Sequence, residues 1–132
     1  MPYEYVINYL TEHLGAKFED NSKLYEELSP FNYAELNGGR SKLLKDISIR
    51  LYVEPDVNWY IQNRGKDYLD MNSIDCAALV NRLKLMGNKK AELIITKDKG
   101  IGEDGKRDPH SWSIVDEEGL VDWAVGILQE QG

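Results

Sequence analysis

A helical pattern that passes directly into a strand pattern, just beyond the middle of the chain, constrains the fold most strongly. From Ser73 to Met86 apolar residues recur at helical spacing, and after Gly87-Asn88 the run Ala91 to Thr96 has the length and composition of a strand. The segments before this junction favour helices and those after it favour strands. We therefore expect an α+β protein rather than a doubly wound parallel sheet.

The N-terminal half predicts a series of helices. Residues 2–14 carry apolar side chains at helical spacing, with Pro2 at a favourable early position and Gly15 as a stop. Residues 22–36 and 41–53 repeat the pattern more weakly. Pro55 opens a further short helix, which the stretch Asn63-Arg64-Gly65-Lys66 should end.

The C-terminal part predicts a small antiparallel sheet. A charged, glycine-rich loop runs from Lys97 to Pro109, and two short segments around Asp116-Glu117-Glu118-Gly119 have the pattern of a hairpin. We expect about three antiparallel strands against which the helix 73–86 packs. A chain of 132 residues suits one domain, with a helical part over 1–70 and the sheet and candidate site over 72–125.

Composition excludes several classes of partner and site. Sixteen Lys plus Arg against 23 Asp plus Glu give a net charge of -7, which disfavours nucleic acid and anionic membranes. No apolar run approaches the about 20 residues of a membrane span, and Met-Pro-Tyr-Glu-Tyr lacks the features of a signal peptide, so we expect a cytoplasmic protein. One cysteine and two histidines exclude an internal disulfide and a usual zinc site, and we expect no metal or cofactor.

The single thiol, Cys76, is the candidate nucleophile. If Ser73 caps the helix, Cys76 lies in its first turn, where free amides and the positive helix end favour thiolate over thiol. His110 opens a predicted strand, and Asp122 lies in the predicted return strand. A thiol, an imidazole and a carboxylate that orients the imidazole form the Cys/His/acid arrangement of nucleophilic acyl transfer.

The order of these pieces resembles the core of the transglutaminase-like, papain-like cysteine enzymes. The matching pieces are Asp75-Cys76-Ala77, Leu85-Met86-Gly87, Ala91 to Thr96, His110-Ser111-Trp112 and Val121-Asp122-Trp123. The resemblance covers the C-terminal half of the chain, and Asp122-Trp123 departs from the Asp-Pro that is usual in that family. It implies a hydrolase or acyltransferase that acts on a peptide bond or a glutamine side chain, through Cys76, His110 and Asp122.

A second, weaker resemblance concerns the NlpC/P60 cell-wall peptidases. Asp75-Cys76-Ala77-Ala78-Leu79-Val80 is similar to the Asp-Cys-Ser-Gly-Leu-Val opening of those enzymes. They normally carry a longer insertion between Cys and His and often use a second His as the third member. In either family the reaction needs an oxyanion donor, and here the Cys76 amide and the side chains of Gln62, Trp59 and Asn72 stay open as choices.

The net charge suggests an alternative function, and the glycine-rich loop matches a nucleotide-binding motif. Small size and negative charge also suit a non-catalytic binding or inhibitor protein of the immunity type, whose partner is basic. Such a protein would have a degenerate transglutaminase-like fold with an inactive site. Gly100 to Gly105 matches G-x-G-x-x-G, but no helix follows to present its N-terminus to a pyrophosphate. We interpret this loop as flexible, and its place before His110 makes it a candidate lid.

Overall fold

The computed structural model describes residues 2–32 and 35–131. The chain divides into two compact units, which we call unit 1 (Met1–Leu44) and unit 2 (Lys45–Gly132). The division falls after Leu44, ahead of the change of sequence pattern near residue 72. The sheet, Cys76 and His110 all belong to unit 2.

Unit 1 is helical, as expected. Helix α1 spans Pro2–Leu14 and confirms the predicted range, with Gly15 following it at a φ of 74°. Helix α2 spans Ser22–Leu28 and starts where the Asn21 side chain accepts a hydrogen bond from the Leu24 amide at 3.2 Å. The helix predicted over 22–36 is therefore shorter, and its residues 33–34 lie outside the described part. A 3₁₀ helix, Leu36–Leu44, completes the unit.

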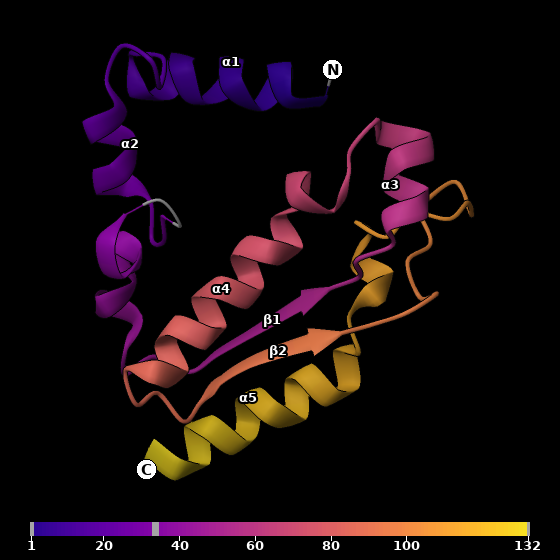
Figure 1. Cartoon of the computed structure of the whole chain (residues 1–132). Helices are drawn as coiled ribbons and strands as arrows, with labels where there is room; N and C mark the ends of the chain where they lie inside the picture. The colour runs from indigo at the N-terminus through magenta and orange to yellow at the C-terminus, as the bar shows by residue number, and fades with distance from the viewer. Residues whose placement is uncertain (1, 33–34, 132) are drawn as a thin grey trace. The chain divides into compact units, whose positions relative to one another are not determined.

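Unit 2 contains two strands and three α-helices among the described residues (Figure 1). Their bounds are β1 Ile49–Val53, α3 Val57–Arg64, α4 Asn72–Leu85, β2 Ala91–Ile95 and α5 Glu117–Gln131. Short 3₁₀ helices occupy Tyr68–Asp70 and Trp112–Ile114. The predicted helix 73–86, the strand from Ala91 and the short helix after Pro55 are confirmed. Gly65 ends α3 in the left-handed conformation, at a φ of 59°.

The sheet corrects the expected architecture. Strands β1 and β2 pair in parallel, with Ile49 opposite Ala91 and Val53 opposite Ile95, so the expectation of a small antiparallel sheet is wrong. Residues 41–53 were expected to be helical, but Ile49–Val53 alternates apolar and polar side chains with a period of two and pairs with β2. A papain-like or transglutaminase-like core is not confirmed by this topology.

The C-terminal segment is a helix instead of a hairpin. Asp116 accepts a hydrogen bond from the Gly119 amide on its side chain at 3.1 Å and from the Leu120 amide on its carbonyl at 2.8 Å. It therefore caps α5, and Glu117 and Glu118 lie in the first turn, where the helix dipole favours acidic groups. The same residues that predicted a turn between strands thus start a helix.

The helices pack along both sides of the strands. Figure 1 draws α4 along one side of β1 and β2 and α5 along the other. Val80 and Leu83 of α4 are almost completely buried. On the α5 side, the Arg50 guanidinium lies 4.9 Å from the centre of the Trp123 ring and donates to the Gly119 carbonyl at 3.2 Å. Unit 2 thus has a β-α-β core with a further helix docked on the sheet.

Candidate functional site

Cys76 lies further into its helix than the sequence suggests. Helix α4 begins at Asn72, so Ser73 is its second residue and does not cap it; the cap position is Met71, which makes no side-chain cap hydrogen bond. Cys76 is the fifth helical residue, beyond the free amides of the first turn. Burial raises the pKa of the half-buried thiol, and the neighbouring Asp75 carboxylate raises it further. The expected activation by the helix start is therefore wrong, and the resting group is a thiol.

His110 lies in an exposed turn that follows the buried residue Pro109. Its backbone N–H donates to the Asp108 carboxylate at 3.0 Å, and this bond fixes the turn. The strand predicted to begin at His110 does not form, because residues 112–114 make a 3₁₀ helix. Ser111 caps that helix, since its side chain accepts a hydrogen bond from the Ser113 amide.

One small pocket of about 50 Å³ nevertheless has both Cys76 and His110 among its lining residues. We call it the cysteine pocket. It lies between the end of β1, the start of α4 and the turn at His110. Its lining residues are Tyr52, Val53, Glu54, Tyr60, Met71, Asn72, Ser73, Cys76, Pro109, His110 and Ile114. Of the three side chains considered as oxyanion donors, Asn72 lines the cysteine pocket, whereas Gln62 and Trp59 do not.

Asp122 is separated from this pair. It lies on α5, where it is exposed, and it is not among the residues that line the cysteine pocket. The sequence placed it on a strand paired with the strand of His110, and neither strand exists. The described structure thus places Cys76 and His110 in the lining of one pocket and Asp122 outside that lining.

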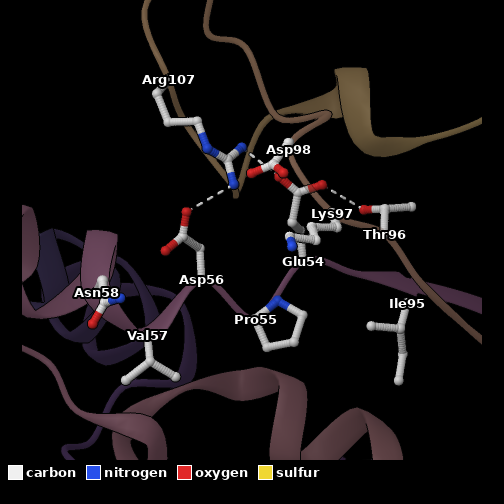
Figure 2. A pocket seen from close by; sticks show the side chains of 10 residues that line it. All are labelled: Glu54, Pro55, Asp56, Val57, Asn58, Ile95, Thr96, Lys97, Asp98 and Arg107. Carbon is white, nitrogen blue, oxygen red and sulfur yellow. Dashed lines mark hydrogen bonds and ion pairs between the residues drawn. The ribbon is translucent and has the colours of Figure 1, made fainter.

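A larger pocket of about 450 Å³ opens beside the first, at the carboxyl ends of both strands. We call it the charged pocket. Figure 2 shows the residues that line it: Glu54, Pro55, Asp56, Val57, Asn58, Ile95, Thr96, Lys97, Asp98 and Arg107. The crevice outside the carboxyl ends of parallel strands is where α/β proteins usually bind ligands. Glu54 lines both pockets, so they share a wall.

A buried carboxylate organises that wall. Only 2% of the Glu54 side chain is exposed, and it forms an ion pair with Arg107. Burial alone would raise the pKa of Glu54, but hydrogen bonds from the Thr96 hydroxyl, from two backbone amides and from Arg107 lower it to about 2. Arg107 also contacts the Asp56 carboxylate at 2.9 Å, and Figure 2 shows its guanidinium between the two acids.

The same contacts attach the loop 97–109 to β1. Glu54 accepts hydrogen bonds from the Lys99 amide at 3.1 Å and from the Gly100 amide at 3.0 Å. Gly100 is required there, because a Cβ at this position would lie 2.2 Å from the Asp108 carbonyl oxygen. The loop expected to be a flexible lid is therefore anchored, and its anchor determines where Pro109 and His110 lie.

Sequence reasoning missed Glu54 and Arg107. The signal was available in part: Glu54-Pro55-Asp56 places two acids directly after a segment that alternates with a period of two. Assigning that segment to a helix hid the strand end, and dismissing the G-x-G-x-x-G match removed Arg107 from consideration. Their pairing joins positions far apart in the chain, which no local pattern reveals.

Comparison with known proteins adds no relative: no family model, curated protein or solved structure matches the chain. Within residues 2–32 and 35–131, no group of three or more His, Cys, Asp or Glu side chains is arranged to hold a metal ion. In the same residues, no helix combines the length and the apolar character needed to cross a membrane. The candidate site therefore rests on its own geometry.

Proposed function

We propose that unit 2 is a cysteine-dependent hydrolase or acyltransferase that acts on an amide, in a peptide bond or a glutamine side chain. Cys76 is the nucleophile and His110 is the base. One observation carries the proposal: these two side chains, on different elements, line the same small pocket. The resemblance of the stretch from Asp75 to Asp122 to transglutaminase-like enzymes supports the same two residues.

The raised pKa of Cys76 defines the order of the proton transfers. Because the resting group is a thiol, an imidazole nitrogen of His110 takes the proton as the sulfur attacks the amide carbon. The C–N bond then breaks, the imidazole returns the proton to the leaving amine, and a thioester remains on Cys76. Water or a second amine attacks this thioester with His110 again as base, which releases the acyl group and restores the thiol.

Acetylation by p-nitrophenyl acetate tests the pair, because an acetyl group is small enough for the cysteine pocket. We expect wild-type protein to release p-nitrophenolate in a burst and to carry acetyl on Cys76, as mass spectrometry would show. His110→Ala should slow acetylation by about 100-fold, the usual contribution of a positioned general base. Cys76→Ser should abolish the burst. His13→Ala is the matched control, because His13 lies exposed on α1 of unit 1.

The proposal fails if His110→Ala acetylates at the wild-type rate, since Cys76 would then behave as an unassisted thiol. Asp122→Asn belongs in the same series. We expect it to leave acetylation unchanged, because Asp122 lies outside the cysteine pocket. A loss in this variant equal to that of His110→Ala would restore Asp122 as the third member of a triad.

A second candidate function is binding of a basic partner by an acidic, non-catalytic protein. The observation that favours it is the exposed acidic start of α5, formed by Asp116, Glu117, Glu118 and Asp122. Such a surface attracts cationic partners and loses affinity as salt is added. The two functions separate with polylysine as the probe: Cys76→Ser should bind it like wild type, and the double variant Glu118→Lys, Asp122→Lys should not.

A further inference from the structure

We infer that the Ser73 hydroxyl is the donor that holds the carbonyl oxygen of the acyl group while Cys76 attacks. The inference rests on the proposed function and adds a catalytic residue to it. The observation behind it is independent of Cys76 and His110: Ser73 carries a buried hydroxyl that lacks a hydrogen-bond partner. The cysteine pocket, which Ser73 lines, is where that partner would lie.

The Ser73 hydroxyl is unsatisfied. Ser73 is 9% exposed, its oxygen is buried, and that oxygen has no hydrogen-bond partner among the described residues. Buried hydroxyls are almost always paired, so an orphan calls for a ligand or a functional reason. A serine within a helix usually bonds a carbonyl three or four residues back. Here those carbonyls belong to Asp70 and Leu69, which lie in the 3₁₀ helix before α4.

Ser73 and Cys76 are three residues apart on α4, so they lie on one helix face with their Cβ atoms about 5–6 Å apart. Both line the cysteine pocket, as does His110. An acyl group attached to the Cys76 sulfur would therefore occupy the pocket that Ser73 also lines. In the tetrahedral intermediate the carbonyl oxygen gains negative charge, and a hydroxyl already shielded from water stabilises that charge most effectively.

The competing donors are weaker candidates. A helix that begins at Asn72 pairs the Cys76 N–H with the Asn72 carbonyl, so this amide is already used. The Ile74 amide donates to the Met71 carbonyl at 3.2 Å. Asn72 lines the cysteine pocket, but the residue is exposed, so its amide is not shielded from water. Among these donors the Ser73 hydroxyl alone is both buried and unpaired in the described structure.

Two reactions of the same sulfur distinguish an oxyanion donor from a structural residue. Acetylation by p-nitrophenyl acetate passes through an oxyanion, whereas alkylation by iodoacetamide displaces iodide directly and forms none. In full-length Ser73→Ala we expect acetylation to fall about 100-fold and alkylation to stay within about twofold of wild type. Ser73→Thr keeps the hydroxyl and should recover most of the acetylation rate. Ser41→Ala, which removes another buried serine hydroxyl, should change neither reaction.

The inference is overturned if acetylation and alkylation fall together in Ser73→Ala, because Ser73 would then act only by positioning Cys76. It is also overturned if neither falls. An Asn72→Ala variant that reproduces the selective loss while Ser73→Ala does not would assign the donor to Asn72 instead. Failure of the proposed function itself looks different, since wild-type acetylation would then be independent of His110. Thermal unfolding of Ser73→Ala excludes misfolding: removing an unpaired buried hydroxyl should not lower the melting temperature.

Discussion

Cys76 has two neighbours that act in opposite directions on its reactivity. Burial and the Asp75 carboxylate raise the pKa of its thiol, while His110, which lines the same pocket, is the base that we propose for it. A thiol held in this state reacts little until a substrate brings the attacked carbon close to the sulfur and the imidazole together. Such a site would be protected from chance oxidation and alkylation in the resting protein.

Asp75→Asn tests the contribution of the neighbouring carboxylate. The negative charge raises the pKa of Cys76, so its removal lowers that pKa and increases the thiolate fraction at any pH below it. We expect iodoacetamide to alkylate Asp75→Asn about two- to fivefold faster than wild type at mildly alkaline pH, since Asp75 is exposed and its effect is screened. Asp122→Asn is the control and should react as wild type. An unchanged rate in Asp75→Asn would mean that burial alone sets the pKa.

We expect the Glu54 carboxylate to contribute more to the free energy of unfolding than any other single charge whose effect we predict. Its folded-state pKa of about 2 lies below the ordinary value of 4.5, so the carboxylate stabilises the fold fully above about pH 4.5. That stabilisation is lost as the pH falls toward 2. The physical source is the set of donors from Thr96, Lys99, Gly100 and Arg107, which no isolated unfolded chain can assemble.

Glu54→Gln should lower the free energy of unfolding by about 3 kcal/mol near neutral pH, because the buried carboxylate loses its charge, and with it the ion pair with Arg107 and the full strength of its hydrogen bonds. Urea denaturation at a series of pH values measures this. The difference from wild type should shrink as the pH falls from 4.5 toward 2. Glu92→Gln is the matched control: its carboxylate pairs with Arg50 at 2.7 Å but is 38% exposed, so we expect a loss below about 1 kcal/mol. If the difference in unfolding free energy between Glu54→Gln and wild type did not change with pH, the lowered pKa of Glu54 would be contradicted.

At the scale of elements, α4 and α5 differ in whether the local sequence pattern is enough to predict a helix. Helix α4 has apolar residues at helical spacing and buries Val80 and Leu83 on one face, so pattern and packing agree. Helix α5 has Gly119 and Gly126 inside it and begins with four residues that also suit a turn. Its helical state depends on the Asp116 cap and on packing of Trp123 against Arg50.

The two glycines of α5 give a paired test of this helix. A Cβ at Gly126 meets no atom within 4 Å, so Gly126→Ala should raise the free energy of unfolding by about 0.5–1 kcal/mol through helix propensity. At Gly119 a Cβ would lie 2.4 Å from the Asp116 carboxylate, which must then leave its capping position. We expect Gly119→Ala to give no stabilisation. Circular dichroism and urea unfolding measure both, and a destabilising Gly126→Ala would favour the hairpin instead.

At the scale of the whole molecule, both pockets are confined to one compact unit. Every residue that lines the cysteine pocket or the charged pocket belongs to unit 2. Unit 1 contributes none of them, and several of its large apolar side chains are exposed, among them Tyr5, Ile7 and Leu36. The fold of unit 2, two parallel strands with a helix on each side, contains the ion pair and the loop anchor that shape both pockets.

A fragment of residues 45–132 should therefore keep the site. Compact units of this kind usually fold alone, so we expect the fragment to acetylate Cys76 within about twofold of the full chain. His110→Ala in the fragment is the control, and it should slow acetylation of Cys76 as much as it does in the full chain. A fragment that is folded by circular dichroism yet inert toward p-nitrophenyl acetate would show that unit 1 is needed for the chemistry.

The sequence by itself determined the elements whose information is local. Helix α1, the short helix after Pro55, helix α4 and strand β2 follow from apolar spacing, a cap or a stop within a few residues. These features need no knowledge of what lies opposite them in space. The catalytic pairing of Cys76 with His110, which came from residue chemistry and a family resemblance, stays a prediction.

Only the tertiary structure decided the rest. Ile49–Val53 becomes a strand because β2 offers it a parallel partner, and parallel pairing needs the whole segment between them as a crossover. Asp116 caps a helix rather than turning a hairpin, and that helix contacts β1 where Trp123 lies against Arg50. The Glu54–Arg107 pair and the unpaired Ser73 hydroxyl arise from burial by distant residues, and burial is a property of the assembled fold rather than of any local stretch.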